Sequence, residues 1–316
     1  MDKNISIIVP CKNEEKYIAI CIEALLQQEI FELIVVDNGS TDATLDILAR
    51  FESDKRVKIL SYTDGGISAV RNFAVNLASS EWLGFIDSDV EVLGDWLDTA
   101  WRHIQEQVET EDANFILGAT YGVRSDPSWI ESSWFVQMSN RDREGGNYIN
   151  GGNMVMTRAL FDQVGGFNTT YQTGEDVKLC KDAMEAGARI IKTPDLKTIH
   201  HGYPRTLAGF FRRERWHGAG MVRSLSRPWK ARDLMLGMYF LSILVAIIPF
   251  CVAMGVTNAV LLSFILLLSP CALIAAVRSR GHGLAECARQ SVLWFVYAAA
   301  KANATFTILR KQLLSR

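Results

Sequence analysis

Ile5-Ser6-Ile7-Ile8-Val9, a short run rich in β-branched residues that Pro10 closes, begins the pattern that decides the fold. Such a run is typical of a buried strand. Residues 13–28 then carry apolar side chains at helical spacing, and 33–36 is a second run of strand length. The alternation continues with a helix at 42–51, a strand at 57–60, a helix at 67–77 and a strand at 82–86. Strands that alternate with helices of about ten residues predict an α/β fold with a mostly parallel sheet and helices on both faces.

The chain is less regular after residue 94. Its spacing still predicts helices at 96–107, 129–138 and 175–186, and strands at 115–121 and 153–156. In open α/β sheets, ligands bind outside the carboxyl ends of the strands. Here each of the first four strands is followed by acidic residues or turn signals, at 10–14, 37–42, 64–66 and 87–89. Four such exits predict one functional site at this edge of the sheet.

Composition narrows the class of protein. The chain has 33 Lys and Arg against 35 Asp and Glu, so no basic excess indicates nucleic acid as a partner. The six cysteines form no CxxC pair and are expected to be reduced and buried. The apolar run at 5–9 is too short for a signal peptide, so the N-terminal part is expected to stay in the cytoplasm.

The C-terminal third is different in character. Residues 234–277 contain no charged side chain, which predicts two transmembrane helices at about 234–254 and 259–277 joined by a tight turn. Arg and Lys flank both ends of this hairpin, so both flanks are expected on the cytoplasmic side of the inner membrane. We expect 288–309 to be an interfacial helix in contact with anionic lipid. A buried helical hairpin of a soluble protein is the alternative.

Acidic pairs are the strongest chemical signals. Asp87 and Asp89 lie two residues apart after a strand and can face one point, as a hard divalent cation requires. A turn that uses Asp only for backbone hydrogen bonds is the alternative. Asp37 lies directly at the end of another strand, where it can meet a ligand, whereas Ser40, Thr41 or Asp42 after it can serve only to cap the next helix. Glu175 and Asp176 begin a predicted helix, where carboxylates either serve chemistry or complement the helix dipole.

The ordered set of motifs resembles a family 2 glycosyltransferase of the GT-A fold, in its membrane-anchored bacterial form. The matching stretches cover about the first 200 residues: IVPCKNE at 8–14, VDNGSTD at 36–42, GISAVRN at 66–72, DSD at 87–89, NGGN at 150–153, GGFN at 165–168 and GED at 174–176. Each stretch alone is common, but the complete ordered set is specific.

The resemblance implies a nucleotide-sugar donor, guessed to be a UDP-sugar, and assigns residues to it. Asp37 would hydrogen-bond the base and Arg71 would approach the base or the diphosphate. Asn153 and the glycines before it would allow the backbone to approach the sugar or the acceptor. The remaining donor-binding residues that it implies are Pro10, Asn13, Glu14, Asp87 and Ser88.

The resemblance also implies a metal and a base. Asp89, with Asp87 and one of His200 and His201, would hold Mg²⁺ or Mn²⁺ on the diphosphate. Asp176 would take the proton of the acceptor hydroxyl, with Glu175 as its neighbour. The stretch at 212–216 partly resembles the QxxRW element of processive synthases, but Arg212 replaces its glutamine.

We therefore expect a catalytic domain at 1–225 and a membrane-associated region at 226–316. The expected activity is metal-dependent, inverting sugar transfer to a hydroxyl of a membrane-associated, lipid-linked glycan. Two other hypotheses remain open: a polyprenyl-phosphate glycosyltransferase, whose phosphate acceptor needs no base, and a catalytically silent subunit that binds nucleotide-sugar.

Overall fold

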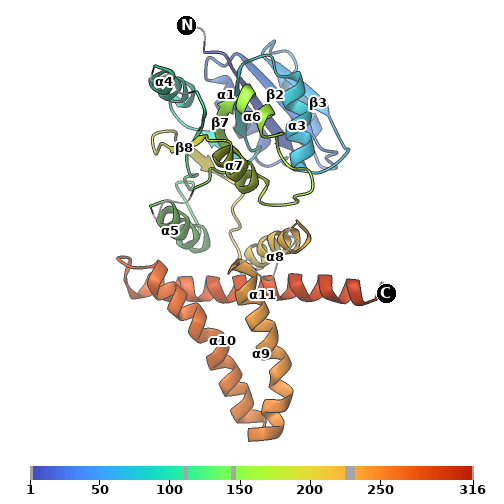
Figure 1. Cartoon of the computed structure of the whole chain (residues 1–316), viewed down its shortest axis with the longest axis vertical. Helices are drawn as coiled ribbons and strands as arrows, with labels where there is room; N and C mark the ends of the chain where they lie inside the picture. The colour runs from blue at the N-terminus through green and yellow to red at the C-terminus, as the bar shows by residue number, and fades with distance from the viewer. Residues whose placement is uncertain (1–2, 110–112, 144–146, 225–231, 315–316) are drawn as a thin grey trace. The chain divides into compact units, whose positions relative to one another are not determined.

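A computed structural model describes residues 3–109, 113–143, 147–224 and 232–314 of the chain. The chain divides into two compact units (Figure 1). The first comprises residues 1–124 and 145–202, and the second comprises 125–144 and 203–316. Each unit is described by itself below.

The first unit is built on a seven-stranded sheet with the strand order β3-β2-β1-β4-β7-β6-β8. Its parallel core comprises β1 (Ile5–Cys11), β2 (Glu32–Asp37), β3 (Val57–Ser61) and β4 (Trp82–Ile86). These strands, except the edge strand β3, are buried along their whole length, as their apolar sequences predict. Their carboxyl ends therefore meet at one edge of the sheet.

The other half of the sheet is mixed. It comprises β6 (Phe115–Gly118), β7 (Asn153–Thr157) and β8 (Arg189–Lys192). β7 runs antiparallel to β4 and β6, whereas β6 and β8 are parallel. A separate two-stranded sheet pairs β5 (Val90–Val92) with β9 (Thr198–His200). This pairing brings the segment after Asp89 against the two histidines.

Helices cover both faces of the large sheet, as predicted. They are α1 (Ile18–Leu26), α2 (Thr44–Leu48, continued by a 3₁₀ turn at Ala49–Phe51), α3 (Ile67–Leu77), α4 (Trp96–Val108), α6 (Arg158–Gln163) and α7 (Glu175–Glu185). Val70, Phe161 and Leu179 of α3, α6 and α7 share one buried cluster with Phe85 of β4. Gly84 faces the opposite side, where an added Cβ would contact Trp96 of α4.

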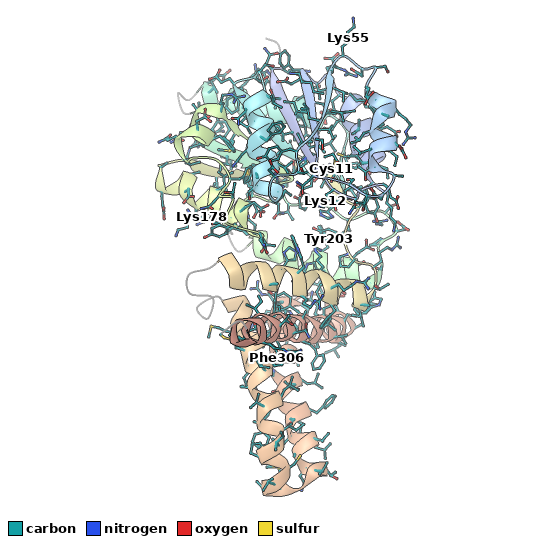
Figure 2. All side chains as sticks on the ribbon, turned by 90° about the vertical axis from the view of Figure 1, so that its right-hand side faces the viewer. Cys11, Lys12, Lys55, Lys178, Tyr203 and Phe306 are labelled. Carbon is teal, nitrogen blue, oxygen red and sulfur yellow. The ribbon has the colours of Figure 1, made fainter. Side chains whose placement is uncertain are left out.

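The second unit is helical and comprises α5 (Trp129–Arg143), α8 (Leu207–Ser224), α9 (Arg232–Met254), α10 (Val256–Arg278) and α11 (Gly283–Leu314). Among the described residues, three segments are long and apolar enough to cross a membrane: Met235–Met254, Val256–Arg278 and Gly283–Arg310. The first two form the predicted hairpin, which turns at Gly255 with φ 80°. The third lies crosswise to that hairpin in Figure 1 and is seen end-on in Figure 2.

Buried contacts explain why α5 and α8 belong to this unit. Trp134 of α5, Phe210 of α8 and Tyr297 of α11 pack in one aromatic cluster. Lys301 Nζ of α11 lies 3.1 Å from Glu214 Oε2 of α8, and both side chains are buried. The structural division therefore falls at residue 202, whereas the sequence placed the boundary near 225. Arg212 and Trp216, the basic and aromatic ends of the QxxRW-like stretch, are exposed on α8.

Candidate active site

The site begins with two loops at the carboxyl edge of the parallel strands. Asn13, after β1, has a φ of 56°, and its Oδ1 accepts a hydrogen bond from the Thr41 backbone N–H at 2.7 Å. The Asn13 N–H in turn donates to Ser40 Oγ at 2.8 Å. Asn tolerates this left-handed conformation better than most residues. Asn13 therefore joins the loop after β1 to the loop after β2, while Pro10 is buried within β1.

Asp37 ends β2 and is buried. Its carboxylate accepts hydrogen bonds from the backbone N–H groups of Gly39, at 2.9 Å, and Ser40, at 3.0 Å. Asp37 thus caps its own turn. The β1 strand separates β2 from β4, so Asp37 and Asp87 end strands about 10 Å apart.

Arg71 is the central cation of the site. It is 1% exposed, and its Nη2 lies 2.6 Å from Asp87 Oδ1 while its Nη1 lies 2.8 Å from Glu175 Oε1. The guanidinium also lies 5.0 Å from the Phe167 ring centroid. Asp87 and Glu175 together raise the pKa of Arg71, so it stays charged despite its burial. The sequence assigned Arg71 to the base or the diphosphate, whereas the structure uses it to join two carboxylates from distant segments.

Tyr121 is a site residue that the sequence analysis missed. Its Oη donates to Asp87 Oδ2 at 3.2 Å and accepts from the Gly152 N–H at 3.0 Å. An added Cβ at Gly152 would lie 2.3 Å from Asp87 Oδ2, so the glycine is required for this close approach. Nothing in the local sequence marks Tyr121, because the contact depends on how the segment after β6 lies against the one before β7.

Glu175 and Asp176 begin α7, after Gly174 in the left-handed conformation. Asp176 Oδ2 accepts a hydrogen bond from the Gly151 N–H at 3.2 Å, next to the Gly152–Tyr121–Asp87 contacts. Burial, followed by the nearby charge of Glu175, raises the pKa of Asp176 to about 6. A carboxylate with this pKa is ionised at neutral pH and is more basic than an ordinary aspartate.

The two histidines separate in the structure. His200 Nε2 lies 3.5 Å from Asp89 Oδ2, whereas His201 Nε2 lies 2.7 Å from Glu91 Oε2. Burial, followed by the charges of Asp89 and Asp87, raises the pKa of Glu14 to about 8, so Glu14 faces the same place. Ser88, between the two aspartates, is buried.

The donors near Asp89 suit a cation that phosphate oxygens complete. No group of three or more His, Cys, Asp or Glu side chains arranged to hold a metal occurs within the described residues. Mg²⁺ is commonly held by one or two carboxylates plus substrate phosphate. Asp89 and His200 fit that requirement, whereas Asp87 is already engaged by Arg71 and Tyr121.

Asn153 does not reach the site with its side chain. It is fully buried, and its amide N–H donates to the carbonyl oxygens of Ala119 and Leu196 at 3.3 and 3.1 Å. Its Oδ1 accepts from Trp96 Nε1 at 3.0 Å. The Asn153 side chain thus holds the start of β7, while Gly151 and Gly152 before it form a close backbone approach to Arg71 and Asp87. The assignment of Asn153 to donor binding stays a prediction.

Comparison with known proteins agrees with this geometry. Residues 6–165, about half of the chain, match the model of glycosyl transferase family 2. The chain belongs to that family. The matched residues include β1, β2, Arg71 and the turn at Asp87–Asp89 after β4. The match ends before Glu175 and Asp176.

Two bacterial relatives share part of the sequence. Glycosyltransferase GlyG of Streptococcus pneumoniae is 34% identical over 38% of this chain and 40% of its own length. Poly(ribitol-phosphate) beta-N-acetylglucosaminyltransferase TarS of Staphylococcus aureus is 36% identical over 32% of this chain and 19% of its own. The matched region thus spans less than half of either relative.

A solved structure shares the fold. The mannosyltransferase PcManGT from Pyrobaculum calidifontis, in complex with GDP-Man and Mn²⁺, superposes with a TM-score of 0.58. The match covers 97% of this chain and 87% of that protein at 18% sequence identity. The likeness extends beyond the family 2 region into the C-terminal helices.

The two salt bridges of Arg71 predict a large loss in the free energy of unfolding when the guanidinium is removed. Arg71→Gln leaves the buried Glu175 and the partly buried Asp87 without their counter-charge, which costs about 3–5 kcal/mol. Thermal and denaturant unfolding of the detergent-solubilised chain measures the loss. Arg50→Gln, an exposed arginine on the same unit, is the control and should change little. Equal stability of the two variants would contradict the bridge.

Proposed function

We propose that this protein transfers a sugar from a nucleotide-sugar to a hydroxyl of a glycan acceptor in cell-envelope polysaccharide synthesis. The observation that supports this proposal most strongly is the pair of salt bridges made by Arg71. They join Asp87 at the end of β4 to Glu175 at the start of α7. Asp87, which the sequence assigns to the donor, and Glu175, which it assigns to the acceptor side, therefore lie next to each other. Relatives such as TarS, whose name specifies poly(ribitol phosphate), support a polymeric envelope glycan as the acceptor.

The donor nucleotide, taken to be a UDP-sugar, lies in this proposal over the loops after β1 and β2. Asn13 and Glu14 line it from one loop and Asp37 from the other, with Asp37 also holding its turn rigid. Asp87, fixed by Arg71 and Tyr121, presents its carboxylate toward the ribose side. A cation held by Asp89 and His200, Mg²⁺ or Mn²⁺, would neutralise charge on the departing nucleoside diphosphate.

Asp176 serves as the general base. Its Oδ2 is oriented by the Gly151 N–H, and its raised pKa suits proton transfer near neutral pH. Glu175 is engaged by Arg71 and so positions its neighbour without taking the proton. Attack by the activated hydroxyl on the sugar carbon then displaces the nucleoside diphosphate in one step, which inverts that carbon, as the family resemblance implies.

The C-terminal unit anchors the protein at the membrane. Side chains such as Val245, Ile248 and Val252 of α9 and Phe264 and Leu273 of α10 are exposed and apolar, as lipid-facing residues are. We propose that this hairpin crosses the inner membrane with both flanks in the cytoplasm, where a lipid-linked acceptor comes close to the catalytic unit.

α11 lies along the membrane interface in this proposal, although its length and hydropathy also permit a crossing. Its exposed apolar residues Leu284, Val292, Phe306 and Leu309 fall within about 100° of arc on one side of the helix. In Figure 2, Phe306 lies on the side of α11 from which the α9–α10 hairpin extends. The opposite side packs on α8 through Lys301 and Ala304.

Turnover with a panel of nucleotide-sugars tests the proposed activity. The solubilised full chain, given Mn²⁺ or Mg²⁺ and envelope glycan acceptors, should release nucleoside diphosphate with at least one donor and lose that activity with EDTA. Asp89→Asn should lose metal-dependent turnover, whereas Asp46→Asn, an exposed aspartate of α2, should not. Nucleotide binding without turnover for every donor would instead favour the silent subunit.

The pH profile tests the base. The rate should fall below about pH 6, because protonated Asp176 cannot accept the hydroxyl proton. Asp176→Asn should remove this limb and lower kcat by about 10²- to 10⁴-fold. Glu185→Gln, at the exposed end of the same helix, is the matched control. Full activity of Asp176→Asn would point to a phosphate acceptor, which needs no base.

Spin-label depth in liposomes tests the position of α11. Labels at Val292→Cys and Phe306→Cys should report the same shallow depth, although the two positions are about 21 Å apart along the helix. The labels go into a background in which Cys251 and Cys287, the partly exposed native thiols, are replaced by serine. Val245→Cys and Val252→Cys on α9 are controls and should differ by about 10 Å. A depth difference near 21 Å on α11 would show a third crossing.

A further inference from the structure

A cavity of about 300 Å³ opens at the amino edge of the sheet in the first unit, opposite the carboxyl edge that carries the candidate active site. Asn4 precedes β1, Phe31 precedes β2, and the stretch from Ser79 to Trp82 leads into β4. Trp101 of α4 completes the wall. The length of β1 separates this cavity from the active site by about 20 Å.

Aromatic rings form much of the cavity wall. Phe31 is 45% exposed although it is a large apolar residue, and Trp101 is partly exposed on the outer side of α4. Trp82 is buried and packs on Phe115, with 5.5 Å between ring centroids. The two partly exposed rings give the cavity an apolar, aromatic wall.

Polar groups complete the wall. Ser80 is 5% exposed, and its Oγ is buried without a hydrogen-bond partner among the residues that the structure describes. The Ser80 hydroxyl is therefore closed off from a ligand in the cavity, and hydrogen bonds to a ligand are left to the exposed side chains of Asn4 and Glu81. Asn4 and Glu81 line the same cavity, and none of the described residues in its lining is Lys or Arg. That composition disfavours phosphate or another anion as the ligand.

We propose that this cavity is a second saccharide-binding site that holds one neutral sugar residue of a glycan. A sugar ring has an apolar C–H face that packs on an aromatic ring and hydroxyls that pair with serine, amide and carboxylate groups. The cavity supplies both, with Phe31 and Trp101 as the platform and Asn4 and Glu81 as hydrogen-bonding groups. Its volume lies at the lower end of the range for small-ligand pockets.

The role of this site rests on the proposed function. A single sugar cannot occupy both edges of the sheet, but a polymeric acceptor or product can place a distant residue in the cavity while its end lies in the active site. The cavity would then retain a long glycan between successive encounters, and it would not act on a short acceptor.

Ligand-detected NMR on the full chain in detergent tests the cavity directly. The probes are the methyl glycosides of glucose, mannose and N-acetylglucosamine at millimolar concentration, without nucleotide or metal. Saturation transfer to ring protons of at least one probe is expected. Phe31→Ala and Trp101→Ala should each weaken binding about three- to tenfold. Trp101→Phe, which keeps a ring, should retain most of it, and Trp129→Ala, an exposed tryptophan of α5, should retain all of it.

Two outcomes would overturn the proposal. One is no transfer to any of the three probes, and the other is transfer that Phe31→Ala and Trp101→Ala leave unchanged. The experiment does not depend on turnover, so a protein that releases no nucleoside diphosphate can still show glycoside binding at the cavity. An active enzyme that binds no glycoside in this way would retain the proposed function and lose only the second site.

Discussion

The buried guanidinium of Arg71 is the interaction on which the site depends. Removing an arginine and two carboxylates from water is costly unless each charge meets a partner with good geometry. Arg71 satisfies this requirement by contacting Asp87 and Glu175 at once, from segments 16 and 104 residues away along the chain. The exit of β4 and the start of α7 are therefore held together before any ligand binds.

Small residues and short hydrogen bonds make that closeness possible. Gly151 and Gly152 let the segment before β7 approach Arg71 and Asp87. A Cβ at Gly152 would collide with Asp87, and one at Gly151 would lie only 3.1 Å from the Arg71 guanidinium. Tyr121 connects Gly152 to Asp87, and Asn13 connects the loops after β1 and β2. Backbone geometry thus supports the side chains that carry the chemistry. Preorganisation of this kind lets a site stabilise charge without rearranging.

The helical unit follows a different physical rule. Its α9–α10 hairpin exposes apolar side chains over most of its length, which water does not tolerate and lipid does. Its other helices are joined by an aromatic cluster and by the buried pair of Lys301 and Glu214. Lys301 lies within the third apolar segment, where its charge is neutralised by Glu214 of α8. This ion pair connects α11 to a helix outside the hairpin.

The sequence by itself determined the alternation of strands and helices, the apolar hairpin and the acidic strand exits, because each depends on local periodicity and composition. The bounds of α3 at 67–77 and of β4 at 82–86 were predicted correctly for that reason. Only the tertiary structure decided that β7 runs antiparallel, that Arg71 bridges two carboxylates, that Tyr121 joins them and that Asn153 is buried. These features depend on contacts between residues far apart in the chain, and local periodicity carries no information about which distant segments meet.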